Sequence, residues 1–258
     1  MPAHPLIYCN GDSYSTEKYH FSLQHKTYAN YVAKIHNGFV INKARSGSCN
    51  RRIIRSSLHD LIHQRQLNPD QKIVALIGLT FELRSEIWTD SLIADYPEES
   101  NFITHVFSDH QDWKTRLLDS IDLDTPNRYN VNKKFLDHYS KGRAYFFSPY
   151  AERINLLADL IMFRAVCQSM NIAFVIFQSP LAEKLENDYL LDFFKKQLQD
   201  DLRIFDLERF SFLDWCTEKK FVPLDMHDQP NIAHYGPDAH EHFAVEVILP
   251  LIQKLNLL

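Results

Sequence analysis

The fold prediction depends on a stretch near the start of the chain, Leu6-Ile7-Tyr8-Cys9-Asn10-Gly11-Asp12-Ser13-Tyr14-Ser15. Its apolar part, residues 6–9, predicts a short buried strand, and Gly11 permits a sharp turn because it has no Cβ. The turn leaves Ser13 at the carboxyl end of the strand. Ligands of open parallel sheets bind at this edge, where the unpaired amides of a following helix stabilise an anion. We therefore expect Ser13 to belong to a functional site.

Other apolar runs predict the remaining strands of the same sheet, at 39–41, 72–79 and 172–177, with a weaker one at 203–205. The run at 72–79 shows no alternation, which is typical of a central parallel strand covered on both faces. Helical spacing of apolar residues lies between and after these runs, at 28–35, 51–61, 154–165, near 183, at 210–219 and at 237–255. Strands that alternate with helices predict an α/β fold, a three-layer α/β/α sandwich with a mostly parallel sheet.

The chain has 258 residues, of which 45% are hydrophobic, enough for the core of one domain. We predict a single domain over 1–258 with an insertion at about 85–145. The insertion is rich in Asp, Asn, His and aromatic residues and shows no clean strand pattern. We expect it to be largely helical and to cover a site.

Composition narrows the class of protein. A net charge of -5 with no concentrated basic run argues against nucleic-acid binding. The four cysteines are far apart and none has metal-site spacing, which favours a reducing compartment. No apolar run approaches the roughly 18 residues of a membrane span, and no signal segment opens the chain, so we expect a cytoplasmic protein. The sequence leaves the oligomeric state open.

A serine hydroxyl is a weak nucleophile, so it needs a base within hydrogen-bond reach and donors for the oxyanion that it forms. His234 lies in a loop just before the last predicted helix and is the candidate base. His240, which also follows an aspartate, is an alternative. The candidate donors all fall at or after predicted strand ends: the backbone amides of Ser13 and Gly47, and the side chains of Asn50 and Thr80.

These blocks resemble the SGNH (GDSL-type) hydrolases. The resemblance rests on Gly11-Asp12-Ser13, on Ser46 to Ile53, on Gly78-Leu79-Thr80, and on a histidine before the C-terminal helix. It implies a flavodoxin-like α/β/α sandwich, no cofactor, and hydrolysis of esters or acetyl groups through a serine acyl-enzyme. By the same resemblance, Ser13 is nucleophile and first oxyanion donor, Gly47 the second donor, and His234 the general base.

The chain departs from the family at two positions. Thr80 stands where the family has its third oxyanion donor, an asparagine, although a threonine hydroxyl can also donate. Asn231 replaces the aspartate three residues before the histidine. An amide can orient an imidazole but cannot stabilise its positive charge, and in a serine protease this exchange lowers turnover by about four orders of magnitude. Asp228 is the alternative carboxylate.

Three residues near the predicted strand ends are candidates for substrate contact: Asp12, Asn50 and Arg84. Arg84 has a structural alternative, an ion pair with Glu86. The arginines around Asn50 form either a solvated helix face or a contact with an anionic substrate, and Ser13 could instead cap a helix. The function that we expect is hydrolysis of a small ester, such as an acetyl or short acyl group on a carbohydrate or similar polar molecule. Thioesters and lipids stay open as alternative substrates. The alternative is a catalytically inactive protein that binds a glycan or a protein through the same cleft.

Overall fold

The fold is built on four parallel strands, β4 (Phe39–Asn42), β1 (Leu6–Asn10), β5 (Ile73–Leu79) and β8 (Ala173–Gln178), which lie side by side in that order. The computed structural model describes residues 4–19, 23–45, 48–81, 84–88, 102–106, 148–180, 182, 184–186, 188–224 and 234–258. β4, the second strand of this sheet along the chain, pairs with one edge of β1. β5 pairs with the other edge of β1, and β8 pairs with β5. This is the flavodoxin-like order, and it confirms the predicted fold class.

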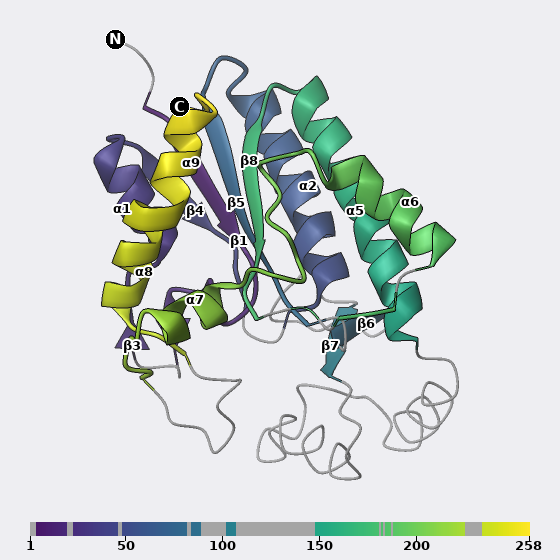
Figure 1. Ribbon diagram of the computed structural model, residues 1–258. Coiled ribbons are helices and arrows are strands. Elements are labelled where there is room, and N and C mark those ends of the chain that lie inside the picture. Colours follow the sequence, from purple (N-terminus) through teal and green to yellow (C-terminus); the bar gives the residue numbers. More distant parts are fainter. Residues whose placement is uncertain are drawn as a thin grey trace, which may run out of the picture.

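The central strands are covered on both faces, as their unbroken apolar runs predict. Every residue of β1 and β5 is buried. The weak strand predicted at 203–205 is present as an isolated parallel bridge between Ile176 and Ile204, at the outer edge of β8. The carboxyl ends of all these strands therefore point to one edge of the sheet (Figure 1).

Helices form the two outer layers (Figure 1). One face carries α1 (Tyr28–Ile35), α8 (Pro237–Phe243) and α9 (Leu249–Lys254), and the other carries α2 (Asn50–Leu67), α5 (Pro149–Ser169) and α6 (Tyr189–Leu198). The short α7 (Phe212–Glu218) follows the bridge at Ile204. Each face has its own apolar core, and the sheet separates the two cores. The predicted helices are thus confirmed, although α6 begins later than the pattern near 183 indicated.

The last helix is continuous but changes its winding. Between α8 and α9 lies a π-helical segment, η2 (Ala244–Ile248). Pro250 follows it and supplies no amide N–H, and its ring would clash with a carbonyl one turn earlier in a regular α-helix. A wider turn removes that clash.

Short antiparallel pairs lie outside the main sheet, and the sequence analysis predicted neither. One joins β2 (Lys18–Tyr19) to β3 (Leu23–Gln24). The other joins β6 (Arg84–Trp88) to β7 (Phe102–Val106), inside the insertion that was predicted to contain no clean strand. Most of that insertion, and with it the test of its largely helical character, lies outside the described residues. Within the described ranges, no helix has the length and apolar character needed to cross a bilayer.

Candidate active site

The Ser13 turn, defined as residues 11–15, leaves β1 at the carboxyl edge of the sheet. The amide of Ser15 donates to the carbonyl of Asp12 over 3.1 Å, and the amide of Tyr14 donates to Asp12 Oδ1 over 3.1 Å. Asp12 therefore closes the turn with both its backbone and its side chain, as short acidic side chains do in Asx turns. Ser13 is half-buried, whereas Asp12, Tyr14 and Ser15 are buried.

Buried hydroxyl and thiol groups connect the Ser13 turn to α1 and β1 by hydrogen bonds. The hydroxyl of Tyr28 donates to Ser15 Oγ over 2.7 Å, and Cys9 Sγ donates to the Tyr28 hydroxyl over 3.6 Å. Burial raises the pKa of Cys9 to about 12, so this thiol stays protonated and is not a nucleophile. Ser15 is thus held in the core by Tyr28 of α1.

Two glycines make room for Ser15. A Cβ built on Gly11 would lie 2.3 Å from Ser15 Oγ, and one built on Gly78 would lie 2.5 Å from the same atom and 2.8 Å from Ser179 Oγ. Side chains larger than hydrogen at these positions would displace the serine. The close approach of β1, β5 and the Ser13 turn therefore requires glycine at both positions.

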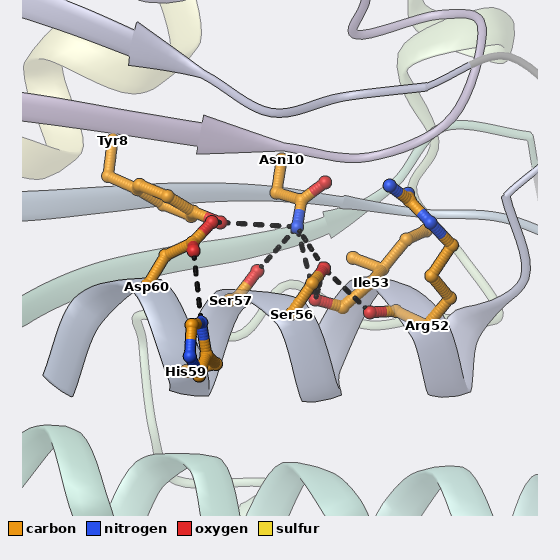
Figure 2. Close-up of polar contacts among 8 residues, drawn as sticks. All are labelled: Tyr8, Asn10, Arg52, Ile53, Ser56, Ser57, His59 and Asp60. Atoms are coloured by element: carbon orange, nitrogen blue, oxygen red, sulfur yellow. Dashed lines mark hydrogen bonds and ion pairs between the residues drawn. The ribbon is translucent and has the colours of Figure 1, made fainter. Parts of the chain in front are cut away.

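On the opposite face of the sheet, Asn10 ties the end of β1 to α2. Figure 2 shows its side-chain nitrogen directed from the strand toward the helix, within 2.9 Å of the hydroxyls of Ser56 and Ser57 and 3.2 Å of the Ile53 carbonyl. The amide oxygen accepts from the backbone N–H of Gly11 over 2.8 Å. The residue that precedes the Ser13 turn is therefore fixed by hydrogen bonds on both sides of its amide.

Tyr8 extends this network along the strand. Its hydroxyl lies 3.3 Å from Asn10 Nδ2 and donates to Asp60 Oδ2 of α2 over 3.0 Å (Figure 2). Burial, with the Asp60 charge, raises the pKa of Tyr8 well above its ordinary value. The phenol therefore remains a neutral donor.

Thr80, the predicted third oxyanion donor, follows β5 and is buried. Its hydroxyl donates to Asp12 Oδ2 over 2.7 Å. Asn50 pairs with its backbone in both directions: the Thr80 amide donates to Asn50 Oδ1 over 2.7 Å, and Asn50 Nδ2 donates to the Thr80 carbonyl over 3.0 Å. The first residue of α2 and the end of β5 are thereby joined to the Ser13 turn through Asp12. Contact of Asp12, Asn50 or Thr80 with a reacting molecule stays a prediction.

His234, the predicted general base, lies against the Ser13 turn. Its ring stacks on the ring of Tyr14, with centroids 4.9 Å apart and planes 21° apart. The His234 carbonyl accepts from the Leu224 amide over 2.7 Å, which fixes its backbone just before α8. The structure thus brings an imidazole from near the C-terminus to the residue that follows Ser13. The role of each residue stays a prediction.

His240, the alternative base, is in a different environment. It is 2% exposed and packs in a cluster of aromatic rings, stacked on Phe212 at 4.9 Å and tilted against His25 at 5.5 Å. Burial, with His25 and His234 nearby, lowers the pKa of His240 to about 3, and burial also lowers the pKa of His25. Both rings are therefore neutral at physiological pH. His240 thus lies in the aromatic core, and its role as the alternative base stays a prediction.

Other predicted site residues have little or no structural description. Gly47, Asp228 and Asn231 lie outside the described residues. Arg84 begins β6, but the side chains of that strand lie outside the description, so its contact with substrate and its ion pair with Glu86 both stay predictions. Of the arginines near Asn50, Arg51 is exposed and Arg52 is buried, with its Nη1 2.6 Å from Ser48 Oγ. The face is therefore not uniformly solvated.

Several residues of the site carried no signal in the sequence analysis. Tyr14 and Ser15 look like turn residues, and Asn10 looks like the end of an apolar strand. Tyr28 was predicted only as part of a helical apolar stripe. The available signal was a polar or hydroxyl-bearing residue at a position that the pattern places in the core, since buried polar groups require hydrogen-bond partners.

The described residues contain no cluster of three or more His, Cys, Asp or Glu side chains that could hold a metal ion. All four cysteines are buried. The cytoplasmic location stays a prediction.

No family model and no curated protein matches the sequence. The structure is similar to an acetyl xylan esterase from the rumen bacterium Butyrivibrio proteoclasticus, with 12% identity over 100% of this chain and 66% of that chain and a TM-score of 0.44. It is also similar to an acetylxylan esterase from Geobacillus stearothermophilus, with 13% identity over 97% of this chain and 95% of that chain and a TM-score of 0.41. A putative GDSL-like lipase from Parabacteroides merdae has 10% identity over 100% of this chain and 98% of that chain, with a TM-score of 0.39. Similarity at this level assigns neither a family nor an activity to the chain.

Proposed function

We propose that this protein is a serine hydrolase that cleaves a small ester, an acetyl or short acyl group on a carbohydrate, through an acyl-enzyme. The observation that carries the proposal is the stack of His234 on Tyr14, which holds a half-buried imidazole beside the Ser13 turn. A histidine that packs on the residue after a serine, at the carboxyl edge of a parallel sheet, is a candidate base for that serine. The order of the four sequence blocks supports the same assignment.

In the proposed reaction, His234 removes the proton from Ser13 Oγ as that oxygen attacks the ester carbonyl carbon. The resulting oxyanion is stabilised by the backbone amides of Ser13 and Gly47. The tetrahedral intermediate collapses, the bond to the alcohol breaks, and His234 returns the proton to the leaving oxygen. Water, deprotonated by His234, then attacks the acyl carbon, the bond to Ser13 Oγ breaks, and His234 returns the proton to that oxygen as the acid leaves.

Thr80 requires one further step to act as third donor. Its single hydroxyl proton is directed to Asp12 in the structure. To donate to the oxyanion, the hydroxyl has to turn away from that carboxylate. Asp12, Asn50 and Arg84 are proposed to contact the substrate around this position.

The hydrogen bond from the Thr80 hydroxyl to Asp12 also favours a second function. With the Thr80 hydroxyl on Asp12 and the Asn50 amide on the Thr80 backbone, the donors at the end of β5 are already engaged. In the sequence, Asn231 also stands where the SGNH hydrolases have an aspartate, three residues before the histidine. A protein that binds a glycan or a partner protein without turnover fits these features.

Labelling with a fluorophosphonate probe, followed by hydrolysis of p-nitrophenyl acetate, separates the two functions. The hydrolase is expected to label and to turn over, and Ser13→Ala should lose both. The matched control is Ser169→Ala, at the end of α5 and exposed, which should behave like the unmodified protein. Absence of labelling and turnover in the folded, unmodified protein would favour the binding protein.

A further inference from the structure

The rings of Tyr14 and His234 are stacked, and the backbone of each residue is held by a hydrogen bond. Tyr14 is 3% exposed and its amide is bonded to Asp12 Oδ1, so its position follows the Ser13 turn. The His234 backbone is bonded to Leu224 just before α8. The rings lie 4.9 Å apart at 21°, which is a stacked arrangement with the face of the phenol toward the imidazole.

The chemistry of a general base explains why that face matters. An imidazole that accepts a proton becomes a cation, and the face of an aromatic ring carries the negative part of its quadrupole. A cation stacked on a tyrosine is therefore stabilised, and its ring is held in one orientation. In serine hydrolases a carboxylate usually supplies both effects.

Two other histidines lie near His234. Burial lowers the pKa of His25 and of His240, and both interact electrostatically with His234. Because both are neutral at physiological pH, neither adds a positive charge that would oppose protonation of His234. The Asp12 carboxylate accepts from the Tyr14 amide and from the Thr80 hydroxyl, which fixes the backbone of Tyr14.

We infer that Tyr14 is a positioning residue that orients the His234 ring and stabilises its protonated form through the stacked aromatic face. This inference rests on the proposed hydrolase function. It assigns a role to the residue after the nucleophile that the sequence pattern does not suggest.

The test compares Tyr14→Leu with the matched control Tyr14→Phe, using kcat and KM for p-nitrophenyl acetate across pH. Tyr14→Phe keeps the ring and should keep kcat/KM within about twofold of the unmodified protein. Tyr14→Leu should lower kcat about tenfold with little change in KM, since a stacked cation contributes on the order of a tenfold rate factor. The acid limb of its pH profile should move to lower pH by about half to one pH unit, because the cation is less stabilised.

Two further measurements make the outcomes decisive. In a His234→Ala background, Tyr14→Leu should have no additional effect on the residual rate, because the two residues act as a unit. Near-ultraviolet circular dichroism and the melting temperature identify a Tyr14→Leu variant that is misfolded, in which case Tyr14→Met replaces it.

The inference is overturned if Tyr14→Leu folds and matches Tyr14→Phe in kcat and in the acid limb. It is also overturned if kcat falls equally in the His234→Ala background. Loss of the proposed function itself looks different: the unmodified protein would then fail to react with the fluorophosphonate at all.

Discussion

The two faces of the sheet hold the end of β1 by different means. Toward α2, Asn10 and Tyr8 make a network of hydrogen bonds to the serine hydroxyls, the Ile53 carbonyl and the Asp60 carboxylate (Figure 2). Toward α1 and α8, the same strand end is held mainly by close packing against Ser15, two glycines and a cluster of aromatic rings.

This difference shows that the Ser13 turn is positioned by two kinds of interaction. Hydrogen bonds specify direction, so the α2 face fixes how β1 leaves the sheet. Tight packing specifies distance, so the α1 face fixes how near the turn lies to β5. Ser13 belongs to the turn that follows β1, so its position depends on the interactions at both faces of the sheet. Each prediction below weakens one face and leaves the other intact.

The largest effect is expected on the α2 face, from Asn10→Asp. The new carboxylate has nearly the same shape but no N–H, so it would face the Ile53 carbonyl without a donor. Burying such an unsatisfied group costs about 3 kcal/mol in the free energy of unfolding. Urea denaturation of Asn10→Asp and of the unmodified protein measures this difference in the free energy of unfolding. Asn68→Asp, at the exposed end of α2, is the control and should change stability little. Equal stability of the two variants would mean that the network contributes little.

On the α1 face, Gly78→Ala is expected to cost roughly 2 to 3 kcal/mol, since its methyl group would lie 2.5 Å from Ser15 Oγ. Placing Gly78→Ala in a Ser15→Ala background removes that contact, so the substitution should cost less there. Thermal or urea unfolding of the four proteins gives the coupling. Strict additivity would contradict the proposed packing.

The aromatic cluster of the α1 face should make stability depend on pH. Burial lowers the pKa of His240 to about 3, so on acidification the unfolded chain binds a proton at this ring that the folded chain does not bind. Stability is therefore lost as pH falls below about 6.5, and the loss from this ring reaches about 2 kcal/mol by pH 5. His240→Phe, in the same cluster, should reduce the difference in unfolding free energy between pH 7 and pH 5. An unchanged difference would show that His240 is accessible to protons when folded.

The smallest effect is expected from Tyr28→Phe, which removes the hydroxyl that links Ser15 to Cys9. Because packing rather than hydrogen bonding dominates this face, the loss should be about 1 kcal/mol. Tyr189→Phe removes a hydroxyl from a side chain that is 85% exposed and serves as the control. A Tyr28→Phe cost near that of Asn10→Asp would remove the distinction between the faces.

The layers of the fold could be predicted from sequence because they depend on local periodicity. An unbroken apolar run such as 73–79 has few alternatives to a central strand. The β6–β7 hairpin could not be predicted, since Arg84 to Trp88 mixes charged and apolar residues without clear alternation. The wide turn before Pro250 was also missed, because a helical stripe does not record how each turn is wound.

In the candidate site, too, some features could be predicted from local sequence and others could not. The positions of Ser13 and His234 in the chain were informative because each follows or precedes a predicted element. The contact between Tyr14 and His234 could not be predicted, since the two residues are 220 positions apart in the chain and no local pattern indicates such a contact. The partners of Asn10 and Thr80 were hidden for the same reason: a pattern gives the face of a residue but not its neighbour.

The close approach of Gly11 and Gly78 to Ser15 also limits which substitutions the chain can accept during evolution. A side chain added at Gly11 or at Gly78 meets the Ser15 hydroxyl within 3 Å. Enlarging either glycine is therefore disfavoured while serine occupies position 15. Among descendants of this sequence, we expect the three to vary together or not at all, and a bulkier residue at 78 to be accompanied by glycine or alanine at 15.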